Sequence, residues 1–577
     1  MGMLKITVFV LFVFLMIYQP IYSMIDSSHV SFCIDTSLFP MKISDLIENT
    51  SDVISIDYDD WGIKNANIYY NLPDYTFMDK RDGFIEIDPL FSDIPNLWRK
   101  SRFYINKINF NTLSAGYNGY LTTPITGFGY TKGDYSFLNV YGFASGSYYE
   151  KGIWGFEFSN ISYDGRYNLY GSKYGRSIGE SLNQNYRLIT EFYPKGLILR
   201  SSIFYNKYMP GVSEYNMSTA YYDFAGSDKN YRVGGYVSLE NPDSINGYKI
   251  GLLTSANIYR RRLGDIKMDG ESSQYQILYN RNFRIFKQDM KININAMNYT
   301  FFSEGKYGRY EIRQSIQTWK NTKYFEFFIR GGLVNTNAVI NSYISLNLSK
   351  YLKMKLNLSR DFYFYPLIYE VMKDTLSNYD LTKGFSVLDR GLELNFNSKY
   401  FASYAGLKFV SADFYLPFKN KPNIGYVGFN EISINEFFLR LQFDFKFENY
   451  VKLSNKVIIP VKNKSDRFLS FYANSSINGY FYLFKGNLKI YFSGGVWYLK
   501  GYDHVAWFEE TNSIGIINFD VFNNDKLYIS GEIGAKVSSF YIYYATYNLN
   551  GRLFSALPLM PYRNRLYTYG VKWWFID

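Results

Sequence analysis

The sequence predicts an all-β protein, a large antiparallel transmembrane β-barrel of about 22 strands, within a range of roughly 18 to 22. The first observation is composition: the 577 residues include 60 Tyr and 50 Phe, and aromatic residues make up 20% of the chain. Membrane barrels flank their lipid-facing band with aromatic girdles, where a tyrosine ring meets lipid and its hydroxyl meets water. The mean hydropathy of −0.21 is too polar for a bundle of membrane helices. It suits a barrel, which shows lipid only every second residue.

The second observation is alternation with a period of two residues, which runs from roughly Ser101 to the end of the chain. In Leu439–Glu448, apolar and polar residues strictly alternate, so a strand there has one apolar and one polar face. The same pattern occurs in four further stretches, which carry Trp154, Phe156 and Phe158; Ile292 and Ile294; Ile344, Leu346 and Leu348; and Met354, Leu356 and Leu358.

Short polar pairs between such stretches predict hairpin turns, because Asn-Gly and Asp-Gly supply the positive φ angles of tight turns. These predicted turns are Ser145-Gly146, Asp164-Gly165, Asn241-Pro242-Asp243, Asn246-Gly247, Asp269-Gly270, Asn478-Gly479 and Asn550-Gly551. The apolar faces fit either the core of a soluble sandwich or the lipid side of a barrel. The number and length of the strands favour the barrel, and a sheet in lipid must close to leave no unpaired edge.

The N-terminus has the pattern of a secretory signal peptide. Lys5 precedes an apolar run from Ile6 to Tyr18, and Ser23 offers a small residue for cleavage. A membrane anchor is the alternative, but the run is shorter than the ~20 residues that a spanning helix needs. We therefore expect a signal peptide over 1–23, a separate segment over 24–105, and the barrel over 106–577.

The last strand carries apolar or aromatic residues on one face. These residues are Tyr567, Tyr569, Val571, Trp573 and Phe575. The pattern resembles the closing strand of bacterial outer-membrane proteins, which implies recognition by the barrel-assembly machinery. The sequence departs from that pattern because Ile576 and Asp577 follow the last aromatic residue. An ordinary edge strand is the alternative interpretation.

The segment 24–105 is acidic, with 14 Asp and Glu against 7 Lys and Arg, although the whole chain is basic. Its short motifs consist of Asp45, Leu46 and Val53, then Asp82 and Gly83, then Ile94 and Pro95. In this order they resemble the plug domain of TonB-dependent receptors, and Met560-Pro561-Tyr562-Arg563 resembles a motif before that family's last strand. The resemblance implies a shortened or degenerate plug. The family's Pro-Gly pair is replaced by Ser51-Asp52, and an unrelated periplasmic extension is the alternative.

Residues for catalysis and metal binding are scarce. One cysteine, Cys33, forms no intrachain disulfide, and two histidines, His29 and His504, are poor material for a zinc site or a catalytic triad. We expect no enzyme activity, no cofactor and no metal. The net charge of +11 indicates a basic surface, a basic lumen that favours anions, or loops that meet lipopolysaccharide. Without a recognition motif, no nucleic-acid partner is expected.

Three functions follow from these expectations, all in the cell outer membrane of a Gram-negative bacterium. The resemblance implies a TonB-dependent receptor-like transporter that takes up an unidentified small solute with a TonB-type energy-coupling protein. The first alternative is a plugless porin-type diffusion channel, and the second is a surface adhesin or scaffold anchored by its barrel. Expected partners are outer-membrane lipid and lipopolysaccharide and the barrel-assembly machinery.

Overall fold

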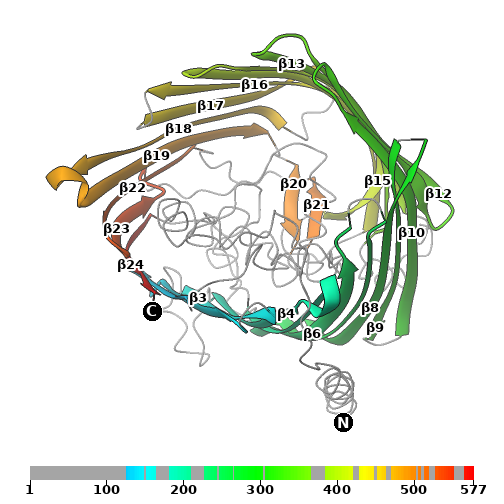
Figure 1. The fold of residues 1–577 in the computed structure, drawn as a ribbon, viewed down its shortest axis with the longest axis horizontal. Coiled ribbons are helices and arrows are strands. Elements are labelled where there is room, and N and C mark those ends of the chain that lie inside the picture. Colours follow the sequence, from blue (N-terminus) through cyan, green and yellow to red (C-terminus); the bar gives the residue numbers. More distant parts are fainter. Residues whose placement is uncertain are drawn as a thin grey trace.

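A computed structural model describes residues of the stretch 125–576, and its strands form one closed ring (Figure 1). The segments left out within this stretch are 135, 149–150, 164–180, 210–226, 244–245, 264–265, 287, 303–305, 366–383, 420–427, 448–450, 463–468, 502–503, 509–512, 519–526 and 551–564. The sheet contains 24 strands. Twenty-two of them follow one another around the barrel, each antiparallel to its neighbours, and β24 pairs with β1 to close it. The predicted fold class and the estimate of about 22 strands are confirmed.

The strands differ in length, and the longest are those around β8 and β15–β16. The first half of the ring contains β1 (Ile125–Gly133), β2 (Leu138–Ser147), β3 (Gly152–Tyr163), β4 (Ser181–Phe192), β5 (Ile198–Met209), β6 (Ser227–Asn241), β7 (Tyr248–Leu263), β8 (Ile266–Ile285), β9 (Gln288–Phe302), β10 (Lys306–Asn321) and β11 (Phe325–Val334). The second half contains β12 (Asn337–Asn347), β13 (Leu352–Tyr363), β14 (Phe385–Asn397), β15 (Phe401–Lys419), β16 (Gly428–Phe447), β17 (Val451–Lys462), β18 (Leu469–Leu483), β19 (Leu488–Gly501), β22 (Leu527–Val537), β23 (Phe540–Tyr547) and β24 (Leu566–Ile576).

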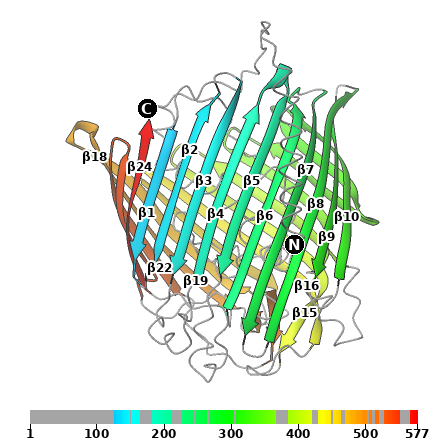
Figure 2. The ribbon, with the colours of Figure 1, turned by 90° about the horizontal axis from the view of Figure 1, so that it is seen from below.

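The two ends of the barrel differ in the length of their connections, and the strands between them are tilted (Figure 2). At one end, here the short-turn end, every connection is brief, as at 286–287, 322–324 and 538–539. Two of these turns contain the 3-10 helices η6 (Pro194–Gly196) and η9 (Phe484–Gly486). At the opposite end, here the long-loop end, the connections include 164–180, 210–226, 364–384, 502–526 and 548–565. Strand β1 begins and β24 ends at the short-turn end.

Strand β16 shows where the apolar outer band begins. From Glu431 onward, its odd-numbered residues face outward. From Phe437 to Phe447 they are all Phe or Leu, whereas nearer the long-loop end they are the exposed polar residues Glu431, Ser433 and Asn435. On the neighbouring strand, Phe409 pairs with Phe437, and Ser411 donates to Asn435 just beyond the border.

The apolar stretch of β16 spans a bilayer. Phe437–Phe447 matches the roughly 9–11 residues that a tilted strand needs to cross the hydrocarbon region. Its even-numbered members Arg440, Gln442 and Asp444 face inward, which is the opposite of a soluble sandwich. The same orientation holds elsewhere, since Ile344 and Leu356 are exposed on the outer face by 51% and 48%. The molecule is therefore a transmembrane barrel and not a sandwich.

Inside the barrel, the long-loop end contains a compact apolar cluster. The short strands β20 (Val505–Phe508) and β21 (Ser513–Ile517) form a hairpin that lies within the ring (Figure 1). Ile516 and Ile517 of this hairpin are fully buried, and they extend the tip of β15 by pairing parallel to Phe418 and Lys419. The inner faces of the surrounding strands supply the other buried apolar side chains: Phe362, Phe385, Val410, Phe414, Leu416, Ile432, Ile434 and Phe438.

Several predicted turns lie in strands instead. Ser145-Gly146, Asp269-Gly270 and Asn478-Gly479 are inside β2, β8 and β18, so these predictions are wrong. The prediction at Asn241-Pro242-Asp243 and Asn246-Gly247 is confirmed, because both groups belong to the β6–β7 turn, where the Asp243 amide donates to Asn241 Oδ1. Asp164-Gly165 lies outside the described residues, as does Gly551.

Candidate functional site: the lumen wall

The inward-facing side chains of the strands form a polar wall, because strand geometry sends every second residue into the lumen. On β8, Gln274 and Gln276 are buried on the inner face, while Tyr275 and Ile277 are exposed on the outer face by 43% and 57%. Three parts of this wall have a defined geometry: a charge network on β4–β7, a bridge between β10 and β13, and a tyrosine–lysine patch on β18–β24.

The charge network lies on four adjacent strands near the short-turn end. Arg200 Nε is 2.6 Å from Glu191 Oε2, and its NH1 is 2.7 Å from Glu240 Oε2. Lys249 Nζ lies 3.5 Å from the same Glu240 oxygen. Tyr193, in the β4–β5 turn, donates to Glu191 at 2.9 Å, and burial together with this carboxylate raises the pKa of Tyr193. Two cations and two carboxylates balance, so this part of the wall has no excess charge.

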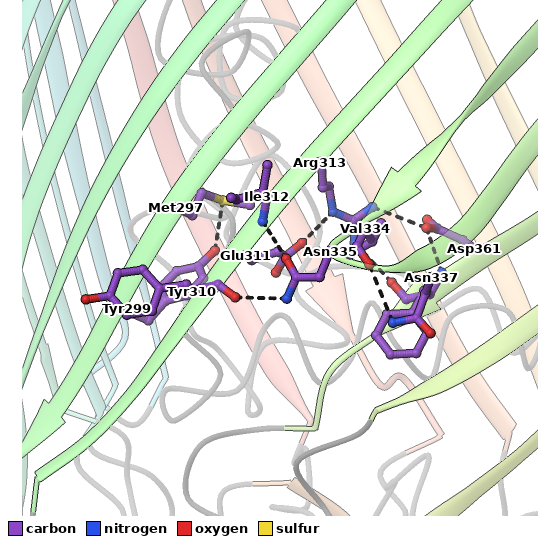
Figure 3. Close-up of polar contacts among 11 residues, drawn as sticks. Met297, Tyr299, Tyr310, Glu311, Ile312, Arg313, Val334, Asn335, Asn337 and Asp361 are labelled. Carbon is purple, nitrogen blue, oxygen red and sulfur yellow. Dashed lines mark hydrogen bonds and ion pairs between the residues drawn. The ribbon is translucent and has the colours of Figure 1, made fainter.

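The bridge lies at the long-loop end, where β13 separates from β12 beyond the pair Ile340–Arg360 (Figure 3). Arg313 of β10 pairs with buried Glu311 and reaches Asp361 Oδ1 at 3.2 Å. It also donates to the Phe362 carbonyl at 3.0 Å, and Arg309 donates to the Tyr365 carbonyl at 2.7 Å. The two arginines thus bind carbonyl groups of a segment that no longer pairs with β12, although β13 stays paired with β14 as far as Tyr363.

The side chain of Asn335 continues the ladder of β10 past the end of the β11–β12 hairpin. Its Oδ1 accepts from the Ile312 amide at 2.7 Å, and its Nδ2 donates to the Tyr310 carbonyl at 3.1 Å (Figure 3). An amide side chain carries the same donor and acceptor as a peptide unit, so it can pair with an exposed strand edge.

The tyrosine–lysine patch covers the inner face of β18, β19, β22, β23 and β24. It consists of Tyr480, Tyr482, Lys489, Tyr491, Glu532, Lys536, Tyr541, Tyr543 and Lys572. The strand registers place Tyr482, Lys489, Lys536, Tyr541 and Lys572 side by side in one row across the five strands. Directly opposed residues of neighbouring strands have Cβ atoms about 4.5–5.5 Å apart, so Lys489 and Lys536 are neighbours, and Lys572 lies two strands further along the row.

Two lysines of the patch, Lys489 and Lys572, lie over tyrosine rings. Lys489 Nζ is 3.8 Å from the centre of the Tyr480 ring and 4.7 Å from that of Tyr491. Lys572 Nζ is 4.8 Å from the centre of the Tyr543 ring. Ring faces carry partial negative charge, so they stabilise cations while leaving the positive charge in place.

Gly570 lets the Tyr543 ring pack closely against the barrel wall. A Cβ atom on Gly570 would lie 2.6 Å from the Tyr543 ring, so that ring lies directly over the glycine. Tyr543 stacks on Tyr541 with centroids 5.6 Å apart and shares a short hydrogen bond with Thr131 of β1. Tyr541 donates to Glu532 at 2.8 Å. The patch is therefore a packed surface with positions fixed by its own contacts.

The patch has an excess of positive charge, with three lysines against Glu532. It favours anions or the oxygen-rich faces of solutes at the lumen wall. These residues could not be identified from the sequence, because their juxtaposition depends on the register of five strands. The closest signal in the sequence was the recurrence of tyrosine at alternate positions, as in Tyr480 and Tyr482 or Tyr541 and Tyr543.

Of the site residues predicted from sequence, the plug-like set lies outside the described residues: Asp45, Leu46, Val53, Asp82, Gly83, Ile94 and Pro95. The C-terminal set lies on β24, where Tyr569 and Trp573 are exposed on the outer face by 55% and 45%. Strand β24 is paired on both sides, so the edge-strand alternative is wrong. The role of these residues in assembly stays a prediction.

The described part of the chain contains neither a metal-binding cluster nor a membrane-spanning helix. No group of three or more His, Cys, Asp or Glu residues lies close enough there to hold a metal ion. Within those same residues, no helix is sufficiently long and apolar to cross a membrane.

Solved structures similar to this chain share its barrel. The FrpB iron transporter from Neisseria meningitidis aligns with a TM-score of 0.60 and 10% identity, over 79% of this chain and 81% of that one. The siderophore receptor PirA from Acinetobacter baumannii aligns with a TM-score of 0.58 and 11% identity, over 78% and 80%. This chain shares the large barrel fold of these receptors and transporters. The copper transporter OprC aligns with a TM-score of 0.58 and 10% identity, over 78% of this chain and 80% of that one.

The likeness lies in the fold of this receptor-type barrel and not in its sequence. No family model and no curated protein matches the sequence. Identities near 10% carry over no individual binding residue to this chain.

Proposed function

We propose that this protein is an outer-membrane transporter of the TonB-dependent receptor type, which takes up a small solute through its lumen. The observation that carries the proposal is the closed barrel of twenty-two strands with an apolar outer band and a polar inner wall. This arrangement of apolar residues outside and polar residues inside is the opposite of that in a soluble protein, and a barrel in a membrane requires it. The receptors and transporters with the same barrel support a transport role over an enzymatic one.

The connections suggest the orientation of the barrel. Outer-membrane barrels have short periplasmic turns and longer extracellular loops, so the short-turn end would face the periplasm. Both the start of β1 and the end of β24 lie at this end. The N-terminal segment would then reach the barrel from the periplasmic side, where a plug and a TonB-type coupling protein would act.

We assign the acidic segment 24–105 to a reduced plug that folds inside the lumen after the signal peptide 1–23 has been removed. Its acidic composition complements the basic excess of the tyrosine–lysine patch. The barrel-assembly machinery would recognise β24, and lipopolysaccharide would surround the long-loop end. Residues 106–577 would form the barrel unit.

Conductance of the refolded protein in a planar bilayer tests this proposal, with the mature chain compared with a variant that lacks 24–105. We expect the mature chain to be closed and the truncated chain to conduct, because removal of a plug opens the lumen. Equal conductance of the two would instead identify a plugless diffusion channel. Absence of conductance in both would indicate a barrel that serves as a surface anchor.

A further inference from the structure

Three consecutive hairpins repeat one turn at the short-turn end. The turns are Thr322-Lys323-Tyr324 between β10 and β11, Ser349-Lys350-Tyr351 between β12 and β13, and Ser398-Lys399-Tyr400 between β14 and β15. In each turn, the lysine is followed by a tyrosine and preceded by a hydroxyl residue. The three turns together are called the lysine–tyrosine strip.

The three turns have the same backbone structure. The hydroxyl of the first residue accepts from the amide three residues on, at 3.0 Å for Thr322, 3.0 Å for Ser349 and 3.1 Å for Ser398. The tyrosine carbonyl of each turn accepts a backbone amide from the next hairpin. The donors are Asn347, Asn397 and Lys446, each at 2.8 Å. These bonds fix the three turns relative to one another along the rim.

Each lysine of the strip lies over the ring of its neighbouring tyrosine. The Nζ atoms are 5.7, 5.6 and 4.9 Å from the ring centres of Tyr324, Tyr351 and Tyr400. All three lysines are exposed, and the tyrosines are exposed by 70%, 48% and 55%. The cations are thus held at the surface, because the ring faces stabilise them without neutralising them.

The strip lies at the border of the apolar band. The Tyr351 ring is 6.3 Å from that of Phe396, which lies 6.0 Å from Phe401 on the outer face. Phe401 in turn lies 5.0 Å from Phe445, the next-to-last outward residue of the band on β16. The strip therefore occupies the level at which a bilayer presents its headgroups. Turns two strands apart are separated by about 10 Å, so each lysine can meet its own headgroup.

We propose that the lysine–tyrosine strip binds the phosphates of anionic phospholipids in the leaflet at the short-turn end. An ammonium group offers donors and positive charge to a phosphate, while the adjoining tyrosine ring lies between the headgroup and the acyl chains. The strip covers one side of the barrel, so it orders lipid on that side. This inference concerns the outer rim and does not depend on what passes through the lumen.

Native mass spectrometry of the full chain in detergent micelles tests the proposal, with phosphatidylglycerol as the anionic probe and phosphatidylcholine as the neutral one. The wild-type protein should retain phosphatidylglycerol at least tenfold better than phosphatidylcholine. The variant K323Q/K350Q/K399Q should lose most of this preference. A matched variant, K132Q/R260Q/K500Q, removes three exposed cations near the long-loop end and should keep it.

Two results would overturn the proposal. One is an undiminished preference in K323Q/K350Q/K399Q, and the other is an equal loss in both variants, which would mean that charge anywhere on the rim suffices. Each protein is first tested for folding by its resistance to dodecyl sulfate in the cold, and bound lipid is measured only for folded protein. Misfolded chains therefore do not enter the comparison. Replacing the three tyrosines by leucine should weaken retention several-fold while the charge stays the same, whereas unchanged retention would contradict the role given to the rings.

Discussion

Arg313 on β10 forms an ion pair with Asp361 on β13, although the β11–β12 hairpin lies between these two strands in the sheet. The pair lies near the end of that hairpin, because Arg313 is opposite Val334, the last residue of β11, and β13 no longer pairs with β12 beyond Arg360. The same guanidinium also pairs with Glu311, whose side chain is only 3% exposed, while that of Asp361 is 33% exposed. Buried Glu311 therefore depends on the arginine to stabilise its charge, whereas water can solvate Asp361.

The first prediction follows from this inequality. Arg313→Met should lower the free energy of unfolding by about 3 kcal/mol, since it leaves buried Glu311 without its arginine. Asp361→Asn should cost less than about 1 kcal/mol, because a partly exposed pair contributes little. Guanidinium titration of the refolded barrel, followed by tryptophan fluorescence, measures both. Equal losses would mean that the Arg313–Asp361 contact, and not Glu311, dominates.

The second prediction concerns the glycine beneath Tyr543. Gly570→Ala should destabilise the barrel by about 1–3 kcal/mol, because the new Cβ would force the ring from its place against the wall. Gly331→Ala is the matched control, since nothing lies within 4 Å of a Cβ built there. It should be close to neutral in the same titration. If Gly331→Ala were also destabilising, the loss of stability would be a property of strand glycines in general and not of the Tyr543 contact.

The third prediction tests the charge of the tyrosine–lysine patch. In the truncated, conducting barrel, K489Q/K536Q/K572Q should shift the reversal potential in a salt gradient toward lower anion preference. The three changes remove the positive excess from that part of the lumen wall. The outer-rim variant K132Q/R260Q/K500Q removes the same charge without touching the lumen, so its reversal potential should match that of the parent. Identical potentials in all three barrels would exclude the patch from the ion path.

The barrel itself could be predicted because one constraint acts on every strand. Each residue that faces lipid within the membrane must be apolar. Residues such as Ile344 and Leu356 therefore show in the sequence which face of a strand points outward, even when the neighbouring strands are unknown. The polarity reversal along β16 is harder to interpret from the sequence. Ile432 and Ile434 face inward and Phe443 faces outward, and only the continuous strand shows that the membrane border lies between them.

The turns were harder to predict, because the hydrogen-bond ladders of long strands override the local preference of residue pairs for turns. Gly270 and Gly479 lie within strands, while Phe286 and Ser538 take turn positions with φ angles of 48° and 52°. A positive φ costs a non-glycine residue about 1–2 kcal/mol, which the ladders of the adjoining strands offset. The tyrosine–lysine patch was beyond sequence reasoning for a related reason. Lys489 and Lys572 come to lie in the same row only through the registers of three strand pairs.

The last prediction uses two positions on the same face of the same strand. Leu441→Arg places a charge in the middle of the apolar band and should lower the free energy of unfolding of the barrel in vesicles by about 2–4 kcal/mol. Ser433→Arg lies beyond the band, next to exposed polar neighbours, and should cost no more than about 1 kcal/mol. Both variants carry the same added charge and side chain, so only depth differs between them. If the two cost the same, the border at Phe437 is misplaced, whereas a large cost at Leu441 alone fixes the level of the bilayer on the barrel.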